Sequence, residues 1–289
     1  MDGHLTFVSL LLVIVSGFMN ALWNFGAKKS KHKSVFLGSI LVVPSAVLMP
    51  YLVYELIATR LPLAAYLLMA LSMTAQCVYS YLLSVAYKLG DLSQVHPIMR
   101  GTGVLLIPLF SVAFLGESLS AVGWAGVAGI AFGILMLTDW SPRGSAGGDG
   151  FRQVLFAVLI GCCITVYTLV DKLTLRYVTP LMLLQISNIG FLLVHLPQLF
   201  HLEKVREEWR LNWKLIFIGS IVSPGSYFLF LLAMNMSPVS HIAPVREIST
   251  VFAALLGVLL LKEKHGIKRM ICSLFVAAGI FLIGISGAQ

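Results

Sequence analysis

Residues 96–117 read HPIMRGTGVLLIPLFSVAFLGE, an apolar segment with one arginine near its start. Arg100 stands at the head of a run of 16 mostly apolar residues that ends at Glu117. With its flanks, this run reaches the roughly 20 residues that a helix needs to cross the hydrocarbon of a bilayer. An arginine on the lipid-facing side of such a helix would cost at least about 2.5 kcal/mol. The stretch therefore predicts a membrane helix whose arginine faces a bundle interior or a water-filled cavity.

The composition of the whole chain agrees with this prediction. Of the 289 residues, 58% are hydrophobic and 11% are charged, and the mean hydropathy is +0.93. Soluble domains average about 25% charged residues. We therefore expect an all-α integral membrane protein without a soluble domain. The apolar runs predict ten transmembrane helices, at residues 5–26, 34–57, 62–88, 93–115, 120–139, 151–172, 179–200, 213–236, 239–261 and 268–286.

The positive charges predict how these spans are oriented. The chain has 20 Lys and Arg residues, and 15 of them lie at the loops after spans 1, 3, 5, 7 and 9. The loops on the opposite side hold three, at Arg60, Lys172 and Arg176. Because basic loops stay in the cytoplasm, we expect a multi-pass protein of the cytoplasmic (inner) membrane with both termini outside. The net charge of +8 is then explained by topology and anionic lipid, so nucleic-acid binding is not expected.

The chain repeats itself at a spacing of about half its length. Residues 245–263 read VREISTVFAALLGVLLLKE, in which Arg246 precedes Glu263 by 17 residues, the same separation as that of Arg100 and Glu117. Each half holds five spans, an odd number, so the two halves lie in the membrane in opposite orientations. Inverted repeats are typical of secondary transporters. The pattern predicts two inverted five-helix repeats, residues 1–140 and 151–289, joined by a Gly/Ser-rich linker at 141–150.

Charged residues at corresponding places in the two halves suggest different roles. Arg100 and Arg246 are candidates for a functional or gating role, and the alternative for each is to snorkel to the headgroups or to clamp helix ends. Glu247 has no acidic counterpart in the first half, and it either carries a proton or neutralises an arginine. Glu117 and Glu263 end their spans, where we expect each to bind backbone donors at the amino end of the next helix.

Polar and small residues predict which helix faces pack inward. Asn20 and Asn24 lie four residues apart on one face of span 1, with Trp23 beside them. A lipid-facing amide pair would be costly, so this face either lines a cavity or makes an interhelical hydrogen bond. We expect His96 near the membrane interface. Span 5 has a face of small residues suited to close helix packing, at Ala125, Gly129 and Gly133.

Several classes of chemistry have no motif in this sequence. The four cysteines lie within spans and lack metal-ligand spacing with histidines, so no metal site is expected. Neither a nucleotide-binding P-loop nor a catalytic His-x-x-Glu-His or Gly-x-Ser-x-Gly sequence is present. We therefore expect no cofactor and no enzymatic activity, and any driving force must come from a gradient of proton, sodium or solute.

Taken together, three sequence segments carry a resemblance to a known family. They are ALWNFGAKK at the end of span 1, Pro97 and Arg100 leading to FLGESLS, and SPVSHIAPVREISTVFAALLGVLLLKEK in the second half. Over essentially its whole length, the chain resembles the EamA-type members of the drug/metabolite transporter superfamily. It departs from the simplest pattern at Lys262, which replaces the glycine that precedes the glutamate in the first half.

The resemblance implies a fold, a function and a set of site residues. It implies a basket of ten helices with a central cavity lined by spans 1, 3, 4, 6, 8 and 9, and with spans 5 and 10 peripheral. It also implies alternating access and the transport of a small organic metabolite, such as an amino acid or another carboxylate, with export as the expected direction. Carried onto this sequence, the cavity residues are Trp23, Asn24, Tyr81, Arg100, Tyr167, Tyr227, Arg246 and Glu247.

The expected partners follow from this hypothesis, and two other functions remain as alternatives. The partners are a small-molecule solute, a coupling proton or sodium ion and membrane lipid, and the protein is expected to be a monomer or a homodimer. One alternative is a membrane sensor or scaffold without transport. The other is an intramembrane enzyme acting on lipid-linked substrates, although the seven histidines are scattered over different segments.

Overall fold

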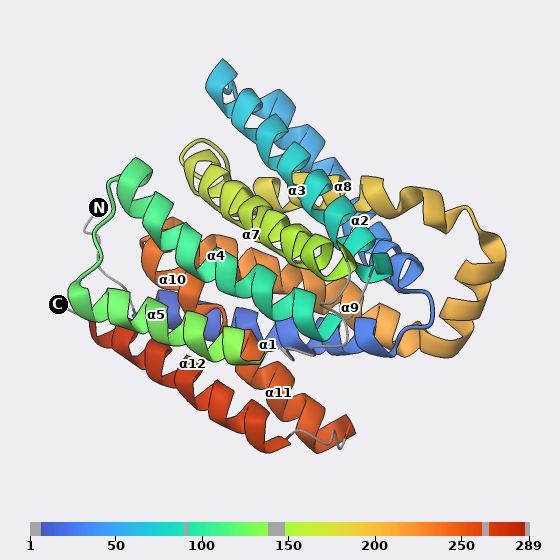
Figure 1. The fold of residues 1–289 in the computed structure, drawn as a ribbon. Coiled ribbons are helices and arrows are strands. Elements are labelled where there is room, and N and C mark those ends of the chain that lie inside the picture. Colours follow the sequence, from blue (N-terminus) through green and yellow to red (C-terminus); the bar gives the residue numbers. More distant parts are fainter. Residues whose placement is uncertain (1–6, 90–91, 138–147, 262–265, 287–289) are drawn as a thin grey trace.

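The protein is entirely helical in the part of the chain that the structure, a computed structural model, describes. These residues are 7–89, 92–137, 148–261 and 266–286. Eight helices are long and apolar enough to cross a membrane, and two shorter apolar helices cover residues 121–136 and 270–286. The helices are α1 (Phe7–Lys29), α2 (Lys33–Ala58), α3 (Leu63–Leu89), α4 (Leu92–Leu115), α5 (Ala121–Met136), α7 (Gly148–Thr174), α8 (Pro180–Leu199), α9 (Leu202–Met236), α10 (Val239–Val245), α11 (Ile248–Leu261) and α12 (Gly266–Ser286) (Figure 1).

The second half departs from the predicted spans in two places. Residues 201–212 were expected to be a loop, but α9 already begins at Leu202 and continues to Met236. The backbone leaves helical geometry at Asn212 (φ −128°, ψ 20°), close to the predicted start of the span. The predicted span 239–261 is divided into α10 and α11, and Arg246 and Glu247 lie at the division. Pro244 accompanies this break, because proline lacks the N–H that would continue the hydrogen-bond ladder.

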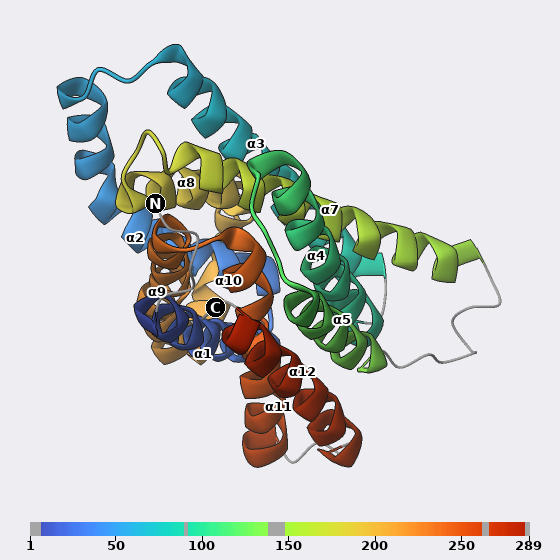
Figure 2. The same ribbon diagram turned by 90° about the vertical axis from the view of Figure 1, so that its left-hand side faces the viewer.

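Helices from the two halves of the chain are packed against one another throughout the bundle. α1 packs on α9 and α11, α3 packs on α7 and α8, α4 packs on α7, and α2 packs on α8 and α9. α5 and α12 lie side by side in both views, next to α11 and away from α2 and α3 (Figures 1 and 2). The peripheral position predicted for the fifth and tenth spans is therefore where α5 and α12 lie.

Glycines allow α5 and α12 to approach closely. A Cβ added at Gly126 would lie 2.7 Å from the carbonyl oxygen of Gly279, and one added at Gly133 would lie 2.8 Å from that of Cys272. We expected the contact face at Ala125, Gly129 and Gly133, but Ala125 is exposed and Gly126 makes the closest approach. Neighbouring glycines left the face ambiguous by one position, which is 100° around a helix.

The predicted partner of Glu117 was wrong. Its carboxylate accepts hydrogen bonds from the backbone N–H groups of Val239 (2.9 Å) and Ser240 (2.8 Å), which begin α10 in the other half of the chain. The following helix α5 is instead capped by Ser120, whose hydroxyl accepts a hydrogen bond from Gly123 N (3.2 Å). Glu117 does bind helix-initiating donors as expected, but it joins the two halves rather than shaping its own turn.

A polar cluster fixes the first turn of the chain to α9. Lys31 and His32 contact the carboxylate of Glu207 at 2.6 and 2.9 Å. The neighbouring Glu208 is fully buried and accepts hydrogen bonds from His32 N and from Asn212 Nδ2, both at 2.7 Å. The hydrogen bond from Lys31, followed by that from His32, lowers the pKa of the exposed Glu207 carboxyl to about 2.

These adjacent glutamates give a matched pair of variants with different expected effects. Glu208→Ala should lower the free energy of unfolding by about 1–3 kcal/mol, because it leaves two buried donors without an acceptor. Glu207→Ala should have a smaller effect, because solvent screens an exposed ion pair.

The Glu207 pKa is depressed in the folded protein, so the contribution of Glu207 to stability is present above pH 4.5, the ordinary value, and is lost as the pH falls towards 2. Thermal unfolding of the purified protein at pH 7 compares the two variants, and a series from pH 7 down to pH 2 follows the loss of the Glu207 contribution. Equal losses for the two variants at pH 7 would contradict the assignment.

Candidate functional site

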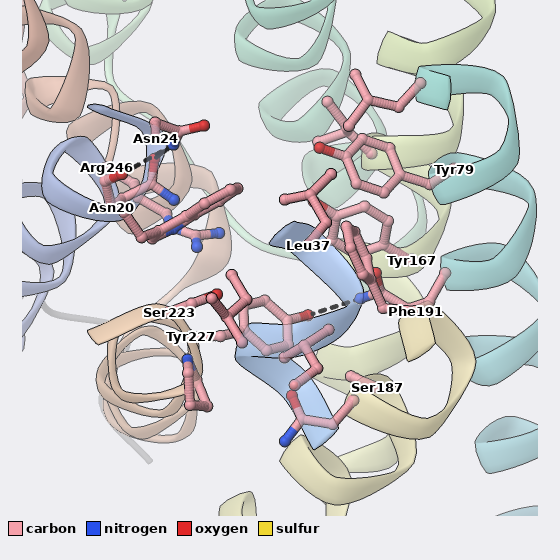
Figure 3. Close-up of a pocket in the computed structure, with 18 of the residues that line it drawn as sticks. Asn20, Asn24, Leu37, Tyr79, Tyr167, Ser187, Phe191, Ser223, Tyr227 and Arg246 are labelled. Carbon is pink, nitrogen blue, oxygen red and sulfur yellow. Dashed lines mark hydrogen bonds between the residues drawn. The ribbon is translucent and has the colours of Figure 1, made fainter. Parts of the chain in front are cut away.

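A cavity of about 110 Å³ lies between the helices of the bundle. Side chains from α1, α2, α3, α4, α7, α8 and α9 line it, together with Arg246 at the end of α10. Figure 3 shows Asn20, Asn24 and Arg246 on one side, facing Tyr79, Tyr167 and Phe191 on the other. The lining residues are Asn20, Trp23, Asn24, Leu37, Ile40, Leu41, Gln76, Tyr79, Leu83, His96, Arg100, Ile164, Tyr167, Ser187, Asn188, Phe191, Ser223, Pro224, Tyr227 and Arg246.

Aromatic rings in mutual contact form one wall of the cavity. Tyr79 packs edge-on against Tyr167, with ring centroids 5.6 Å apart, and lies 6.3 Å from Phe191. Tyr167 in turn lies 6.5 Å from Tyr227, also in an edge-to-face arrangement. Edge-to-face rings are favourable and hold one another in place. The wall therefore offers a solute a preformed apolar surface with hydroxyl groups at its edges.

Arg246 is the cationic group in this cavity that has no carboxylate partner among the described residues. Its guanidinium lies 4.2 Å from the centroid of the Phe230 ring and 5.4 Å from that of the Tyr227 ring. Its Nε atom is buried and has no hydrogen-bond partner. Aromatic faces attract a cation but do not satisfy its donors. The site therefore holds a positive charge with hydrogen-bonding capacity for an anion, and a carboxylate matches the guanidinium in charge and in geometry.

Arg100, at the corresponding place in the first half, is neutralised within the protein. Its Nη1 atom lies 2.9 Å from Oε1 of Glu247, and its Nη2 donates to Oδ1 of Asn20 at 3.4 Å. The Arg100 side chain is 18% exposed and that of Glu247 is 8% exposed. Of the two roles weighed for Glu247, this geometry is the one expected for neutralising an arginine. Glu247 itself does not line the cavity.

The Arg100–Glu247 pair predicts strongly non-additive stability effects. Glu247→Met alone should destabilise the protein by about 3–5 kcal/mol, because it leaves a buried guanidinium without its counter-charge. The double variant Arg100→Met/Glu247→Met should regain most of this loss, since a buried pair replaced by apolar residues is often nearly neutral. A double-mutant cycle of thermal unfolding measures the coupling. Additive losses would show that the two charges do not depend on each other.

The structure brings together most of the site residues expected from the sequence. Trp23, Asn24, Arg100, Tyr167, Tyr227 and Arg246 all line the cavity. Tyr81 does not: it is 61% exposed, and Tyr79 lines the cavity instead. The two tyrosines are two residues apart on α3, which rotates them by about 200° around a helix and puts them on opposite faces.

Several functional residues were missed, and part of the lining was misplaced. The second and seventh spans were not expected at the cavity, but α2 contributes Leu37 and α8 contributes Ser187 and Asn188. The sequence QISN at 185–188 carried a signal, since a polar run inside an apolar span has to be buried. Ser187 Oγ and Asn188 Nδ2 are buried without a hydrogen-bond partner. His96, expected near the interface, also lines the cavity.

A fully buried carboxylate, Asp171, lies beyond the aromatic wall. It accepts hydrogen bonds from the hydroxyls of Ser72 on α3 and Tyr227 on α9. The Tyr227 hydroxyl also accepts a hydrogen bond from Gln76 Nε2 at 3.3 Å, the dashed line beside Tyr227 in Figure 3. No Lys, Arg or His pairs with Asp171 in the described part of the chain. Among the same residues, no three His, Cys, Asp or Glu side chains are grouped so that they could hold a metal ion.

The cavity lies towards one end of the bundle. Its lining includes Asn24, Leu37 and His96, which are within two turns of the ends of α1, α2 and α4 that adjoin the basic loops. At the opposite end the helices are joined by partly buried polar contacts. There the Lys172 ammonium donates to the carbonyls of Met234 and Ser237 (the latter at 2.9 Å), and Glu117 caps α10.

The fold and this site define a class of protein: a multi-pass helical membrane protein with a polar, partly aromatic cavity inside the bundle. Residues 151–285 match the EamA-like transporter family. The match covers much of the second half of the chain, which is therefore similar to this transporter family.

Two similar proteins extend this comparison. One, from Sinorhizobium sp, is named "Uncharacterized transporter in cobO 3'region" and is 44% identical over 52 residues, which are 18% of this chain and 36% of that protein. The match thus spans about a third of that relative's length. A solved structure titled "Crystal structure of protein" has a TM-score of 0.73 and 15% identity, over 96% of this chain and 95% of that one. At that identity the likeness shows a shared fold and nothing further.

Proposed function

We propose that this protein is a secondary transporter that carries a small organic carboxylate across the cytoplasmic membrane by alternating access. The observation that carries the proposal is Arg246, a partly buried cation that lines the cavity and whose buried Nε atom has no hydrogen-bond partner among the described residues. Because an uncompensated charge in a membrane protein is costly, its retention there is best explained by binding an anion. The similarity of the second half to the EamA-like transporter family supports transport as the activity.

The packing of the helices supports the inverted repeat that is typical of many secondary transporters. If α1 to α4 correspond to α7, α8, α9 and α10–α11, and α5 corresponds to α12, then each major contact has a counterpart. The α1–α9 contact matches α7–α3, α4–α7 matches α11–α1, and α2–α9 matches α8–α3. The α5–α12 and α2–α8 contacts match themselves. This pattern is what a two-fold relation between residues 1–140 and 151–289 would produce.

The position of the cavity fits one state of such a cycle. Under the positive-inside orientation, the end that adjoins the basic loops is cytoplasmic, so the cavity lies on the cytoplasmic side and the polar contacts of Lys172 and Glu117 close the outer side. Alternating access would break these outer contacts and close the inner ones. A solute taken from the cytoplasm in this state would leave on the outside, which agrees with export.

The lining restricts the chemistry of the solute. Arg246 would bind its carboxylate, while the side chains of Ser187 and Asn188 have unused hydrogen-bonding groups for a further polar substituent. The wall formed by Tyr79, Tyr167 and Phe191 suits an apolar or flat portion. Amino acids and small hydroxy or dicarboxylic acids meet these requirements.

Release of a mixed set of carboxylates from proteoliposomes tests the proposal. Vesicles containing the purified protein are loaded with the twenty ¹³C-labelled amino acids together with labelled lactate, malate and succinate, and the released compounds are identified by mass spectrometry. We expect selective release of one or a few of them, absent from protein-free vesicles and reduced by Arg246→Ala. Release of none, or of all equally, would contradict a carboxylate-selective transporter.

A further inference from the structure

Among the described residues, the Asp171 carboxylate is held by neutral groups. It lies on α7, one turn before that helix ends at Thr174, and it has no exposed surface. Both of its hydrogen bonds come from hydroxyls, those of Ser72 and Tyr227. Burying a charged carboxylate without a cation is expensive, and such groups become neutral readily by binding a proton.

The ionisable groups around Asp171 come from two of the helices packed in its surroundings. α9 contributes the Tyr227 hydroxyl, and α7 itself contributes Tyr167 one turn earlier. The next residue, Lys172, directs its ammonium away, to the carbonyls of Met234 and Ser237. α3 contributes Ser72, which does not titrate, and α4 contributes no charged group to the surroundings of Asp171 in the described residues. The carboxylate is therefore free to exist in either protonation state.

Tyr227 places this carboxylate next to the solute cavity. Its hydroxyl donates to Asp171, and the face of its ring lies 5.4 Å from the guanidinium carbon of Arg246. The same side chain lines the cavity. One residue thus contacts both the buried carboxylate of Asp171 and the partly buried guanidinium of Arg246, and neither has a charged partner among the described residues.

The charges inside the bundle balance in two states of the protein. Arg100 and Glu247 cancel each other in direct contact. Without solute, an ionised Asp171 would balance the charge of Arg246. With a monocarboxylate bound to Arg246, the interior is neutral only when Asp171 has bound a proton. We propose that Asp171 is the proton-coupling residue and that the protein moves one proton together with each carboxylate, an inference that rests on the proposed transport function.

The proposed cycle conserves protons and charge. On the side where solute is taken up, the anion binds Arg246 and a proton from water forms an O–H bond to a carboxylate oxygen of Asp171. After the conformational change the anion leaves, that O–H bond breaks, and the proton passes to water on the other side. The loaded and empty carriers are both neutral inside, so net transport should respond to a pH difference and not to the membrane potential. A carboxylate that accumulates in the cytoplasm would leave with a proton.

An infrared titration tests the protonation of Asp171 without any solute. The purified protein in lipid bilayers is titrated between pH 4 and 9, and the carboxylic C=O absorption is compared for wild type, Asp171→Asn and Glu203→Gln. Glu203 is an exposed carboxylate on α9 and serves as the matched control. We expect a titrating band that is lost in Asp171→Asn and kept in Glu203→Gln. The same band in wild type and Asp171→Asn would overturn the proposal.

Exchange and net flux separate coupling from transport itself. With the labelled carboxylate mixture on one side of the membrane and the same unlabelled mixture on the other, Asp171→Asn should exchange within about twofold of wild type, because asparagine resembles the protonated aspartate. Its net release into carboxylate-free buffer should fall at least about tenfold, since the empty carrier would have to reorient with an uncompensated charge.

Each outcome of these flux measurements has a distinct meaning. The coupling is supported if release by wild type changes with an imposed pH difference and does not change with a valinomycin-generated membrane potential. It is also supported if the response to the pH difference is lost in Asp171→Asn. If a pH difference drove release by Asp171→Asn as strongly as by wild type, the proposed role of Asp171 in proton coupling would be overturned. If wild type neither releases nor exchanges any carboxylate, the proposed function fails, and the infrared titration alone still decides whether Asp171 binds a proton.

Discussion

Arg246→Ala is expected to abolish carboxylate transport while leaving the protein folded. Removing one partner of a buried, hydrogen-bonded charge pair costs about 2–5 kcal/mol, or at least about thirtyfold in solute affinity. Because no described carboxylate pairs with Arg246, the variant should unfold at the same temperature as wild type or at a higher one. Proteoliposome release and thermal unfolding of the same preparation measure both effects.

Two comparisons distinguish binding by Arg246 from a merely structural role. Arg246→Lys keeps the positive charge but cannot form the bidentate hydrogen bonds of a guanidinium. Its affinity for the carboxylate should therefore lie between those of wild type and Arg246→Ala. Arg100→Ala should lower the unfolding temperature, because it leaves Glu247 without its partner. Wild-type transport by Arg246→Ala, or a loss of stability as large as that of Arg100→Ala, would contradict the assignment.

Gly279→Val is expected to prevent correct packing of α12 on α5. A Cβ at Gly279 would lie 2.5 Å from the carbonyl oxygen of Gly126 and 2.9 Å from the backbone nitrogen of Ile130. Backbone atoms cannot rotate away as a flexible side chain can, so the two helices must separate. Overpacking of this kind costs about 1–3 kcal/mol and occasionally more. The yield of monodisperse protein in detergent and its unfolding temperature should both fall.

Gly284→Val on the same helix is the matched control. A Cβ at Gly284 meets nothing within 4 Å, and both substitutions introduce the same β-branched residue into α12. Any effect of helix propensity is therefore shared by the two variants. If Gly279→Val and Gly284→Val were equally stable, the close approach of α5 and α12 would not contribute to folding.

The sequence predicted the membrane helices and the inward position of the two arginines because both depend on local properties. A run of apolar residues has to lie in lipid, and a charge inside such a run has to avoid it. The sequence could not predict which partner each charge would find. Arg100 and Arg246 occupy matching places in the repeat, yet one contacts Glu247 and the other faces the cavity. That difference depends on the break between α10 and α11, which is a property of the packed bundle.

Other errors came from reading one helix at a time. Tyr79 and Tyr81 are equivalent by composition, and the choice between them requires the rotation of α3 against α7 and α8. Glu117 was predicted to bind the helix that follows it. Its actual partner, the start of α10, lies more than a hundred residues away in the sequence, and only the tertiary structure brings the two together. Asp171 looked like the polar end of a span, and only the tertiary structure places it behind Tyr227.

Under the proposed orientation and transport cycle, the position of the cavity has a pharmacological consequence. In this conformation the cavity lies towards the basic-loop end, and the Lys172 and Glu117 contacts separate it from the other end. A blocker that fits the cavity in this state would have to arrive from the cytoplasm. Such a compound would need to cross the membrane before it could act, whereas an externally applied blocker would have to recognise the opposite conformation. Inhibitors of the two kinds should therefore compete with solute from opposite faces of the membrane.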